Sequence, residues 1–292
     1  MFPVSSPSSS AGRSLWYSVW HRYKKNKLAM VGLILMFILI LASLSAGVFI
    51  DYSKVTAISA GNRLLPPSSR HWLGTDNYGR DIFARIIYGS RVSLSVGLIT
   101  VVCSLATGGF IGAVAGYFGG KVDEILMRIM DIMLAIPSII LAICFVAALG
   151  SSVPNLVVAL TLSRMPQFSR VVRAAVLPIK NQEYIEAAAA FGTSSSRIIL
   201  KHILPNVLGP IIVQATLQVG SIILSIAGLS FIGLGIQPPT PELGSMLSDL
   251  RAYMRTHPFL VIPPGVAIML TVFSFNRIGD GLRDALDPKL RN

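Results

Sequence analysis

The sequence predicts an all-α protein that crosses a membrane several times. Of its 292 residues, 53% are hydrophobic and only 13% are charged, and the mean hydropathy is +0.67. Long apolar runs recur along the chain with polar stretches between them, and a spanning helix needs about 20 mostly apolar residues. This composition excludes a soluble domain of ordinary make-up.

The first 27 residues form a separate N-terminal tail. Residues 1–14 are rich in Ser and Pro and lack periodicity, so we expect them to be disordered. Residues 16–27, WYSVWHRYKKNK, mix aromatic and basic side chains, as an interfacial segment on anionic lipid does. The apolar run at 28–50 is too long for a signal-peptide core and has no clear A-x-A cleavage site, so we expect it to remain as the first membrane helix.

Residues 28–292 are predicted to form a transmembrane domain of six helices. The apolar runs lie at roughly 28–50, 92–116, 126–148, 153–176, 207–235 and 258–278. Six spans place both termini on one side of the membrane. That side holds 17 of the 25 Lys and Arg residues, so the positive-inside rule makes both termini cytoplasmic. The net charge of +12 does not indicate nucleic-acid binding, because the cations are dispersed between apolar runs with few aromatic residues beside them.

One polar stretch between two apolar runs, YIEAAAAFGTSSSRIILKHILPN at 184–206, is predicted to be a helix-turn-helix on one membrane face. Glu186 and the four alanines after it favour a short helix with a smooth surface. Gly192 permits a turn, and the hydroxyl residues at 193–196 supply caps for a second helix. Pro205 suits the first turn of the next helix. Loops of this length are usually functional or disordered, and the helix signals favour function.

The same stretch resembles the EAA loop in permease subunits of ATP-binding-cassette (ABC) importers. The matching residues are Glu186, Ala187, Ala188, Gly192, Leu204 and Pro205, and His202 stands where the family often has isoleucine. Four more stretches look like the dipeptide, oligopeptide and nickel branch: LGTDNYGRD (73–81), MRIMDIMLAIP (127–137), QPPTPELGSMLSD (237–249) and GDGLRDALDPKLR (279–291). The short first outer loop resembles the second, C-type, dipeptide permease subunit.

The resemblance implies a type I ABC importer permease fold in the cytoplasmic (inner) membrane. The implied partners are a second homologous permease subunit, two P-loop ATPase subunits and an extracytoplasmic substrate-binding protein. By resemblance, the ATPases would dock on Glu186, Ala187, Ala188, Gly192, His202, Leu204 and Pro205, and the binding protein would face Asp76, Arg80, Asp81 and Glu242. The implied cargo is a dipeptide or oligopeptide, with nickel, glutathione or another small solute as alternatives.

No enzymatic chemistry is predicted for this chain. The P-loop pattern GxxxxGK[ST] does not occur in the sequence, so we expect ATP and Mg to be bound by the ATPase subunits and no cofactor here. The four histidines have no Cys or carboxylate at metal-ligand spacing, so no metal site is predicted. A membrane serine protease would need a buried Ser and His together, and no apolar run contains a histidine.

Arg164 lies near the middle of the fourth apolar run. An isolated cation at that depth costs on the order of 3 kcal/mol on insertion scales, so it should face other helices or water. It is a candidate for the translocation path, where it would attract a substrate carboxylate; a structural ion pair or a different segment boundary is the alternative. A secondary transporter is the less favoured function, because it needs coupling-ion residues and the other deep segments hold almost no ionisable groups.

Three further features are also predicted. Arg128 and Asp131 are three residues apart, which favours an ion pair on one helix face. Arg170 and Arg173 lie near the cytoplasmic end of the fourth run, where we expect them to reach the membrane interface. The glycines of the second run at 108, 109, 112 and 116 have the spacing that lets two helices pack closely.

Overall fold

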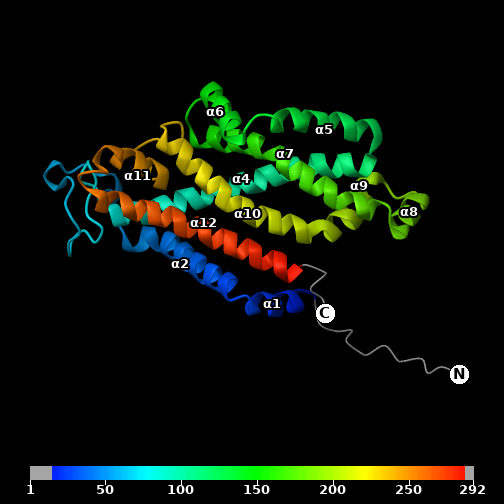
Figure 1. Cartoon of the computed structure of the whole chain (residues 1–292), viewed down its shortest axis with the longest axis horizontal. Coiled ribbons are helices and arrows are strands. Elements are labelled where there is room, and N and C mark those ends of the chain that lie inside the picture. Colours follow the sequence, from blue (N-terminus) through cyan, green and yellow to red (C-terminus); the bar gives the residue numbers. More distant parts are fainter. Residues whose placement is uncertain (1–14, 287–292) are drawn as a thin grey trace.

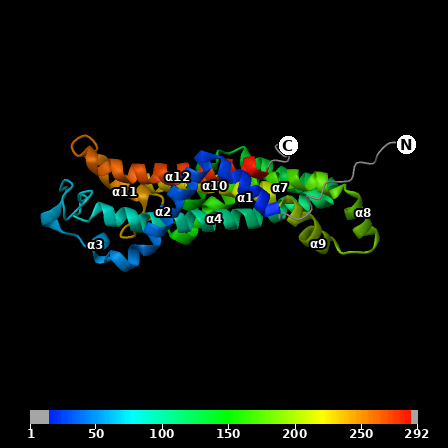
Figure 2. The same cartoon turned by 90° about the horizontal axis from the view of Figure 1, so that it is seen from below.

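Five long helices run side by side along the molecule in the computed structural model, which describes residues 15–286 (Figures 1 and 2). No β-strand occurs in that part of the chain, so the all-α prediction is confirmed. The five are α2 (Lys27–Phe49), α4 (Ile82–Phe118), α7 (Val153–Lys180), α10 (Leu204–Phe231) and α12 (Pro258–Leu286). The expected disorder of residues 1–14 lies outside the described residues.

Shorter elements complete the bundle and define its two ends. Beside the long helices lie α1 (Leu15–Lys25), which contacts α12, α5 (Gly120–Leu134), which contacts α4 and α7, and α6 (Ser138–Leu149), which contacts α7. One end carries α3 (Ser53–Thr56), α11 (Leu243–Leu250) and the loop between α3 and α4; we call it the α11 end. The other carries α8 (Glu183–Ala190) and α9 (Ser195–Ile198); we call it the α8 end. Both views place these two groups at opposite ends of the long axis (Figures 1 and 2).

The number of membrane spans is only partly settled by helix length and composition. Within residues 15–286, α2, α4, α12 and the continuous helix formed by α9 and α10 are long and apolar enough to cross a membrane. The bent pair α5 and α6 would make a fifth span. The 28-residue α7 would be the sixth, but it is less apolar than the other long helices and does not qualify by the same measure. The six-helix count therefore stays a prediction.

Two predicted segments differ from the helices observed. The second run begins at Ile82, ten residues before the expected 92, because Asp81 caps the helix there. The third run, expected to be continuous over 126–148, is broken between α5 and α6 with a bend of 88°. Pro137 lies at this break; proline lacks an N–H and disfavours helical geometry in the residue before it. The segment expected as one helix is therefore two helices in the structure.

Close packing of α4 on α7 is the most extensive helix contact in the described chain. A Cβ added to Gly108 would overlap the carbonyl oxygen of Met165, and one added to Gly112 would overlap that of Ser169. Only glycine lets the two backbones approach this closely. The prediction from glycine spacing is confirmed.

Ion pairs join α5 to the C-terminal half of α7. Arg173 donates through Nε and Nη2 to both oxygens of Asp123, at 2.5 and 2.6 Å. Arg170 donates to Asp131 at 2.6 Å. Asp131 therefore pairs with Arg170 of α7. The ion pair with Arg128 that the spacing predicted does not form, because folding brings the guanidinium of Arg170 to Asp131.

Candidate functional sites at the two ends of the bundle

The polar stretch at the α8 end folds as the predicted helix-turn-helix. Its first helix, α8, has Glu183 and Glu186 in the first turn, where carboxylates favour the positive end of the helix dipole. Gly192 ends it with a φ of +77°, in the left-handed region. The N–H groups of Gly192 and Thr193 donate to the carbonyls of Ala189 and Ala188 at 3.0 and 3.1 Å, which is a Schellman motif. A π-helical turn, Ile199–Ile203, then joins α9 to α10.

Buried side chains fix this helix-turn-helix to the bundle. Ile185, Ile198 and Ile203 are at most 3% exposed and belong to one apolar cluster with Val172 and Val176 of α7. At the other side of the loop, the side-chain amide of Asn206 donates to the hydroxyl of Tyr184 at 3.2 Å. A displacement of α8 would therefore be transmitted to α7 and α10.

The exposed surface of this loop combines small apolar residues of α8 with charged side chains, among them Glu186, Arg197 and Lys201. Glu186 and Ala187 are exposed, and Ala188 is half-buried. The side chain of Phe191 is 90% exposed, the largest value among the exposed large hydrophobic residues of the described chain. Sequence reasoning missed Phe191, although an aromatic residue directly before the turn glycine was visible in the sequence. Exposed aromatic residues are typical anchors of protein interfaces.

The remaining residues predicted for this loop lie where it enters α10. His202 and Leu204 are half-buried, and the carbonyl of His202 accepts a hydrogen bond from Asn206 at 2.6 Å. Pro205 is exposed at the start of α10, directly after the π-helical turn. The structure thus brings the seven residues predicted for docking into one loop, with Glu186, Ala187, Gly192 and Pro205 on its outside.

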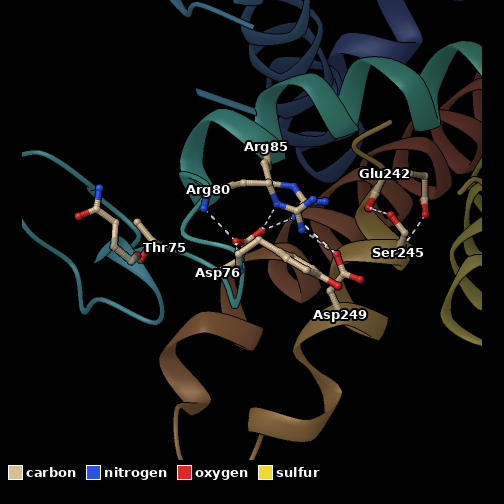
Figure 3. Close-up of polar contacts among 9 residues, drawn as sticks. Thr75, Asp76, Arg80, Arg85, Glu242, Ser245 and Asp249 are labelled. Atoms are coloured by element: carbon tan, nitrogen blue, oxygen red, sulfur yellow. Dashed lines mark hydrogen bonds and ion pairs between the residues drawn. The ribbon is translucent and has the colours of Figure 1, made fainter. Parts of the chain in front are cut away.

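A buried charge cluster organises the α11 end, and Asp76 is its centre (Figure 3). Its carboxylate accepts from the backbone N–H groups of Tyr78 and Arg80 at 2.8 and 2.9 Å, from Arg80 Nε at 2.6 Å, and from Arg85 Nη1. Arg80 Nη2 also donates to Asp249 of α11 at 3.0 Å. Two arginines and two aspartates thus link the loop, the first turn of α4 and α11.

The cluster is almost wholly removed from solvent. Asp76 is 1% exposed, Arg80 4% and Arg85 1%. Buried charges are tolerated when they are paired and hydrogen-bonded, and here each carboxylate faces both guanidinium groups. Arg85 was not singled out from the sequence, where it is only one arginine among several in this loop.

Two further carboxylates at this end cap helices. Asp81 accepts from the N–H of Ala84 at 2.9 Å at the start of α4, and its other oxygen lies 2.7 Å from Nδ1 of His71. Glu242 is fully buried; it accepts from the N–H of Ser245 at 2.8 Å and from the hydroxyl of Ser93 at 3.1 Å (Figure 3). Both carboxylates satisfy groups within the chain.

The four residues expected to face a binding protein do not point outward. Asp76, Arg80 and Glu242 are buried, and the side chain of Asp81 is 13% exposed. Their charges are balanced by partners from other elements of the same chain, which the sequence pattern did not reveal. They hold the elements of this end together within the chain.

Arg164 of α7 bridges to α10 inside the bundle. Its Nη2 donates to the hydroxyl of Ser225 at 2.7 Å, and that hydroxyl donates to the carbonyl of Ser221 at 3.0 Å. Its Nε is buried without a hydrogen-bond partner. The described residues supply no carboxylate within ion-pair distance of Arg164. The structural ion pair considered from the sequence is therefore absent from this part of the chain.

Comparisons with known proteins place this arrangement among transport proteins. Residues 108–292 match the model of the inner membrane component of binding-protein-dependent transport systems, and residues 14–67 match the N-terminal TM domain of oligopeptide transport permease C. The dipeptide transport system permease protein DppC of Alkalihalophilus pseudofirmus is 50% identical over 279 residues, which cover 96% of this chain and 91% of the relative. The glutathione transport system permease protein GsiD of Escherichia coli is 42% identical over 279 residues, covering 96% and 92%.

A solved structure supports the fold independently. The MetNI methionine ABC transporter, in an inward-facing conformation, has a TM-score of 0.53 and 20% sequence identity, and the match covers 68% of this chain and 96% of the other. At that identity the likeness shows the fold alone, and it confirms the predicted permease fold. With a family model over more than half of its length and relatives aligned over nearly all of it, the chain belongs to the inner membrane components of binding-protein-dependent transport systems.

Proposed function

We propose that this chain is the C-type permease subunit of an ATP-driven importer of dipeptides or oligopeptides. The observation that carries the proposal is the 50% identity to a dipeptide permease over nearly the whole chain, together with the match at 14–67 to the permease C domain. A second homologous permease subunit would supply the other half of the pathway. Glutathione is the first alternative cargo, because a glutathione permease is 42% identical, and nickel or another small solute follows.

Two P-loop ATPase subunits would dock on the loop at the α8 end. The exposed Ala187 surface and Phe191 suit a groove on a partner, and the buried Ile185 cluster ties the loop to α7 and α10. Movement of the ATPases would then rock these helices as rigid bodies and open the path alternately to each side. ATP and Mg would be bound by the ATPases, with no cofactor in this chain.

The proposed orientation places the α8 end in the cytoplasm with both termini and the α11 end on the side of an extracytoplasmic binding protein. The excess of Lys and Arg around the termini and the 184–206 loop supports it. The described start of α1 and the end of α12 lie in the half of the molecule that carries α8 (Figure 1). The membrane would be the cytoplasmic membrane.

The assembly is tested by gentle purification of the tagged chain from its native membrane, with identification of every co-purifying protein by mass spectrometry. A second permease and one or two P-loop ATPases are the expected result. A chain recovered alone that takes up solute with a proton gradient would favour the secondary transporter instead.

Coupling is tested by Glu186→Lys. Because the side chain of Glu186 is exposed, the substitution should leave membrane insertion intact. It should abolish both ATPase co-purification and peptide uptake. Glu124→Lys, also an exposed carboxylate but on α5, is the matched control and should transport normally. Normal uptake by Glu186→Lys would show that α8 does not dock as proposed.

Arg164 is proposed to lie on the translocation path and attract the carboxylate of the cargo. Two observations support this proposal: Arg164 has no acidic partner among the described residues, and its Nε makes no hydrogen bond. The guanidinium can therefore donate hydrogen bonds to an external anion. Arg164→Gln should lower uptake of a dipeptide more than uptake of the same dipeptide with an amidated C-terminus. Equal effects on the two cargoes would remove the carboxylate role.

A further inference from the structure

The corner between α1 and α2 packs closely against the end of α12 (Figure 1). Asn26 separates the two helices at this corner, where its backbone is extended. A Cβ added to Gly281 of α12 would overlap the Cβ of Ala29 and the ring of Tyr23. Because glycine has no Cβ, the three helices can approach this closely, and α1, α2 and α12 are held together at this point.

A polar pocket of about 360 Å³ lies beside this junction. Its charged and amide side chains are Asn26, Arg277, Asp280, Arg283 and Asp284. The side chain of Asn26 accepts a hydrogen bond from the N–H of Ala29 at 3.1 Å and donates one to the carboxylate of Asp284 at 3.1 Å. A single amide therefore caps α2 and also holds the carboxylate of Asp284 in place.

Both arginines of this pocket have hydrogen-bond donors that the described residues do not use. Nη1 of Arg277 lies 3.5 Å from Asp280, which is a long ion pair, and its buried Nε has no hydrogen-bond partner. Arg283 is exposed, and no carboxylate of residues 15–286 lies within ion-pair distance of it. A guanidinium carries several N–H donors in one plane and suits a phosphate, which accepts several hydrogen bonds at once. The pocket thus combines donors for a phosphate with a fixed carboxylate.

The charges of the pocket are balanced, and this balance indicates the kind of ligand. A purely anionic ligand would meet the arginines, but it would also lie against the carboxylates of Asp280 and Asp284, which repel it. A ligand that carries a phosphate and a primary ammonium matches both signs of charge. A quaternary ammonium has no N–H to donate to a carboxylate. Phosphoethanolamine, the headgroup of phosphatidylethanolamine, therefore has the chemistry that fits this pocket.

An exposed apolar face leads from the pocket along α2, as the acyl chains of a lipid require. Leu28 lines the pocket and is 56% exposed. Val31, Ile34, Ile38 and Leu41 follow at steps of three or four residues, which keeps them on one side of the helix, and each is between 45% and 55% exposed. Of the four helices that are long and apolar enough to span a membrane, α2 is the least buried inside the chain, at 22% against 39% or more.

We propose that the pocket between the α1–α2 corner and the end of α12 binds the headgroup of phosphatidylethanolamine. Arg277 and Arg283 donate to the phosphate, Asp284 accepts from the ammonium, and the acyl chains lie along the exposed face of α2. The N-terminal segment, which the sequence predicts to lie on anionic lipid, thus lies next to a site for a zwitterionic lipid. This inference goes beyond the proposed function and depends neither on the cargo nor on the ATPases.

The test measures lipid binding to the complete transporter in detergent by native mass spectrometry. Dioleoyl phosphatidylethanolamine, phosphatidylcholine and phosphatidylglycerol are titrated separately, and the dissociation constant of the first bound lipid is determined. Phosphatidylethanolamine should bind roughly tenfold more tightly than the other two, because it alone satisfies both the arginines and the carboxylate. Soluble O-phosphoethanolamine should compete only weakly, because it has no acyl chains to remove from water.

Two substitutions of exposed residues separate the two charges of the headgroup. Asp284→Asn should weaken binding of phosphatidylethanolamine roughly tenfold and strengthen binding of phosphatidylglycerol, because it removes the ammonium acceptor and a repelling carboxylate. Arg283→Gln should weaken binding of both lipids, because both carry the phosphate. Glu124→Gln and Arg128→Gln, at exposed positions of α5, are the matched controls and should bind all three lipids like the unmodified transporter.

The unmodified transporter already decides the choice of lipid, without any variant that has to fold. Equal affinity for the three lipids, or a preference for phosphatidylglycerol, would overturn the inference. Unchanged binding of phosphatidylethanolamine by both Asp284→Asn and Arg283→Gln would overturn it as well, because the lipid would then lie elsewhere. Competition by O-phosphoethanolamine as strong as that by the lipid would identify a soluble ligand and overturn the lipid assignment. Each of these outcomes leaves the proposed function standing, since uptake and co-purification test that separately.

Discussion

Replacing Asp76 by Asn should destabilise the α11 end strongly. The substitution keeps the size of the side chain and an oxygen that can accept from the N–H groups of Tyr78 and Arg80. It removes the charge that faces two guanidinium groups whose side chains are 5% and 1% exposed. Asp249 would then be the remaining carboxylate in the cluster for both Arg80 and Arg85.

The magnitude follows from burial. Breaking a buried ion pair by removing one partner costs about 3 to 5 kcal/mol, because the other charge is left uncompensated. Since Asn preserves the backbone contacts, we expect about 3 kcal/mol, the lower end of that range. An exposed pair is worth about 1 kcal/mol or less. Asp280→Asn, whose side chain is 49% exposed and 3.5 Å from Arg277, is therefore the matched control.

The assay is the thermal midpoint of the purified transporter in nanodiscs, followed by limited proteolysis of the loop at 63–80. The Asp76→Asn variant should unfold at a clearly lower temperature and be cut faster in this loop, whereas Asp280→Asn should match the unmodified protein. Adding Arg85→Met to Asp76→Asn should restore part of the loss, because it removes the unpaired cation. An Asp76→Asn midpoint equal to that of Asp280→Asn would refute the view that this cluster is a structural clamp.

Two glycine substitutions test the other parts of the fold. Gly112→Ala should cost about 1 to 3 kcal/mol in thermal unfolding, because its Cβ would overlap the carbonyl oxygen of Ser169, whereas Gly47→Ala, with nothing within 4 Å, should be neutral or slightly stabilising. Equal midpoints for the two would contradict the close approach of α4 to α7. Gly192→Ala should cost about 1 kcal/mol through its left-handed backbone alone, since its Cβ meets nothing, and should speed amide hydrogen exchange over 183–190. Unchanged exchange there would mean that the turn does not hold α8 in place.

The sequence by itself determined the features that depend on local pattern. Apolar runs of sufficient length predict helices in a membrane, and the alanines, Gly192 and Pro205 predicted the two helices and the turn at the α8 end. Glycine spacing predicted the face that α4 presents to α7, because residues three and four apart share one side of a helix. The family could also be inferred, since its motifs are contiguous in the chain.

Only the tertiary structure decided which charges meet. Arg80 and Asp249 are 169 residues apart in the chain, and Arg170 and Asp131 are 39 apart. No local sequence pattern predicts such pairings. A charged residue is the same letter in the sequence whether its side chain faces solvent or a partner that folding brings close. For that reason Asp76, Arg80 and Glu242 were expected at the surface and lie inside, whereas Arg63, Arg70, Arg251 and Arg255 are exposed.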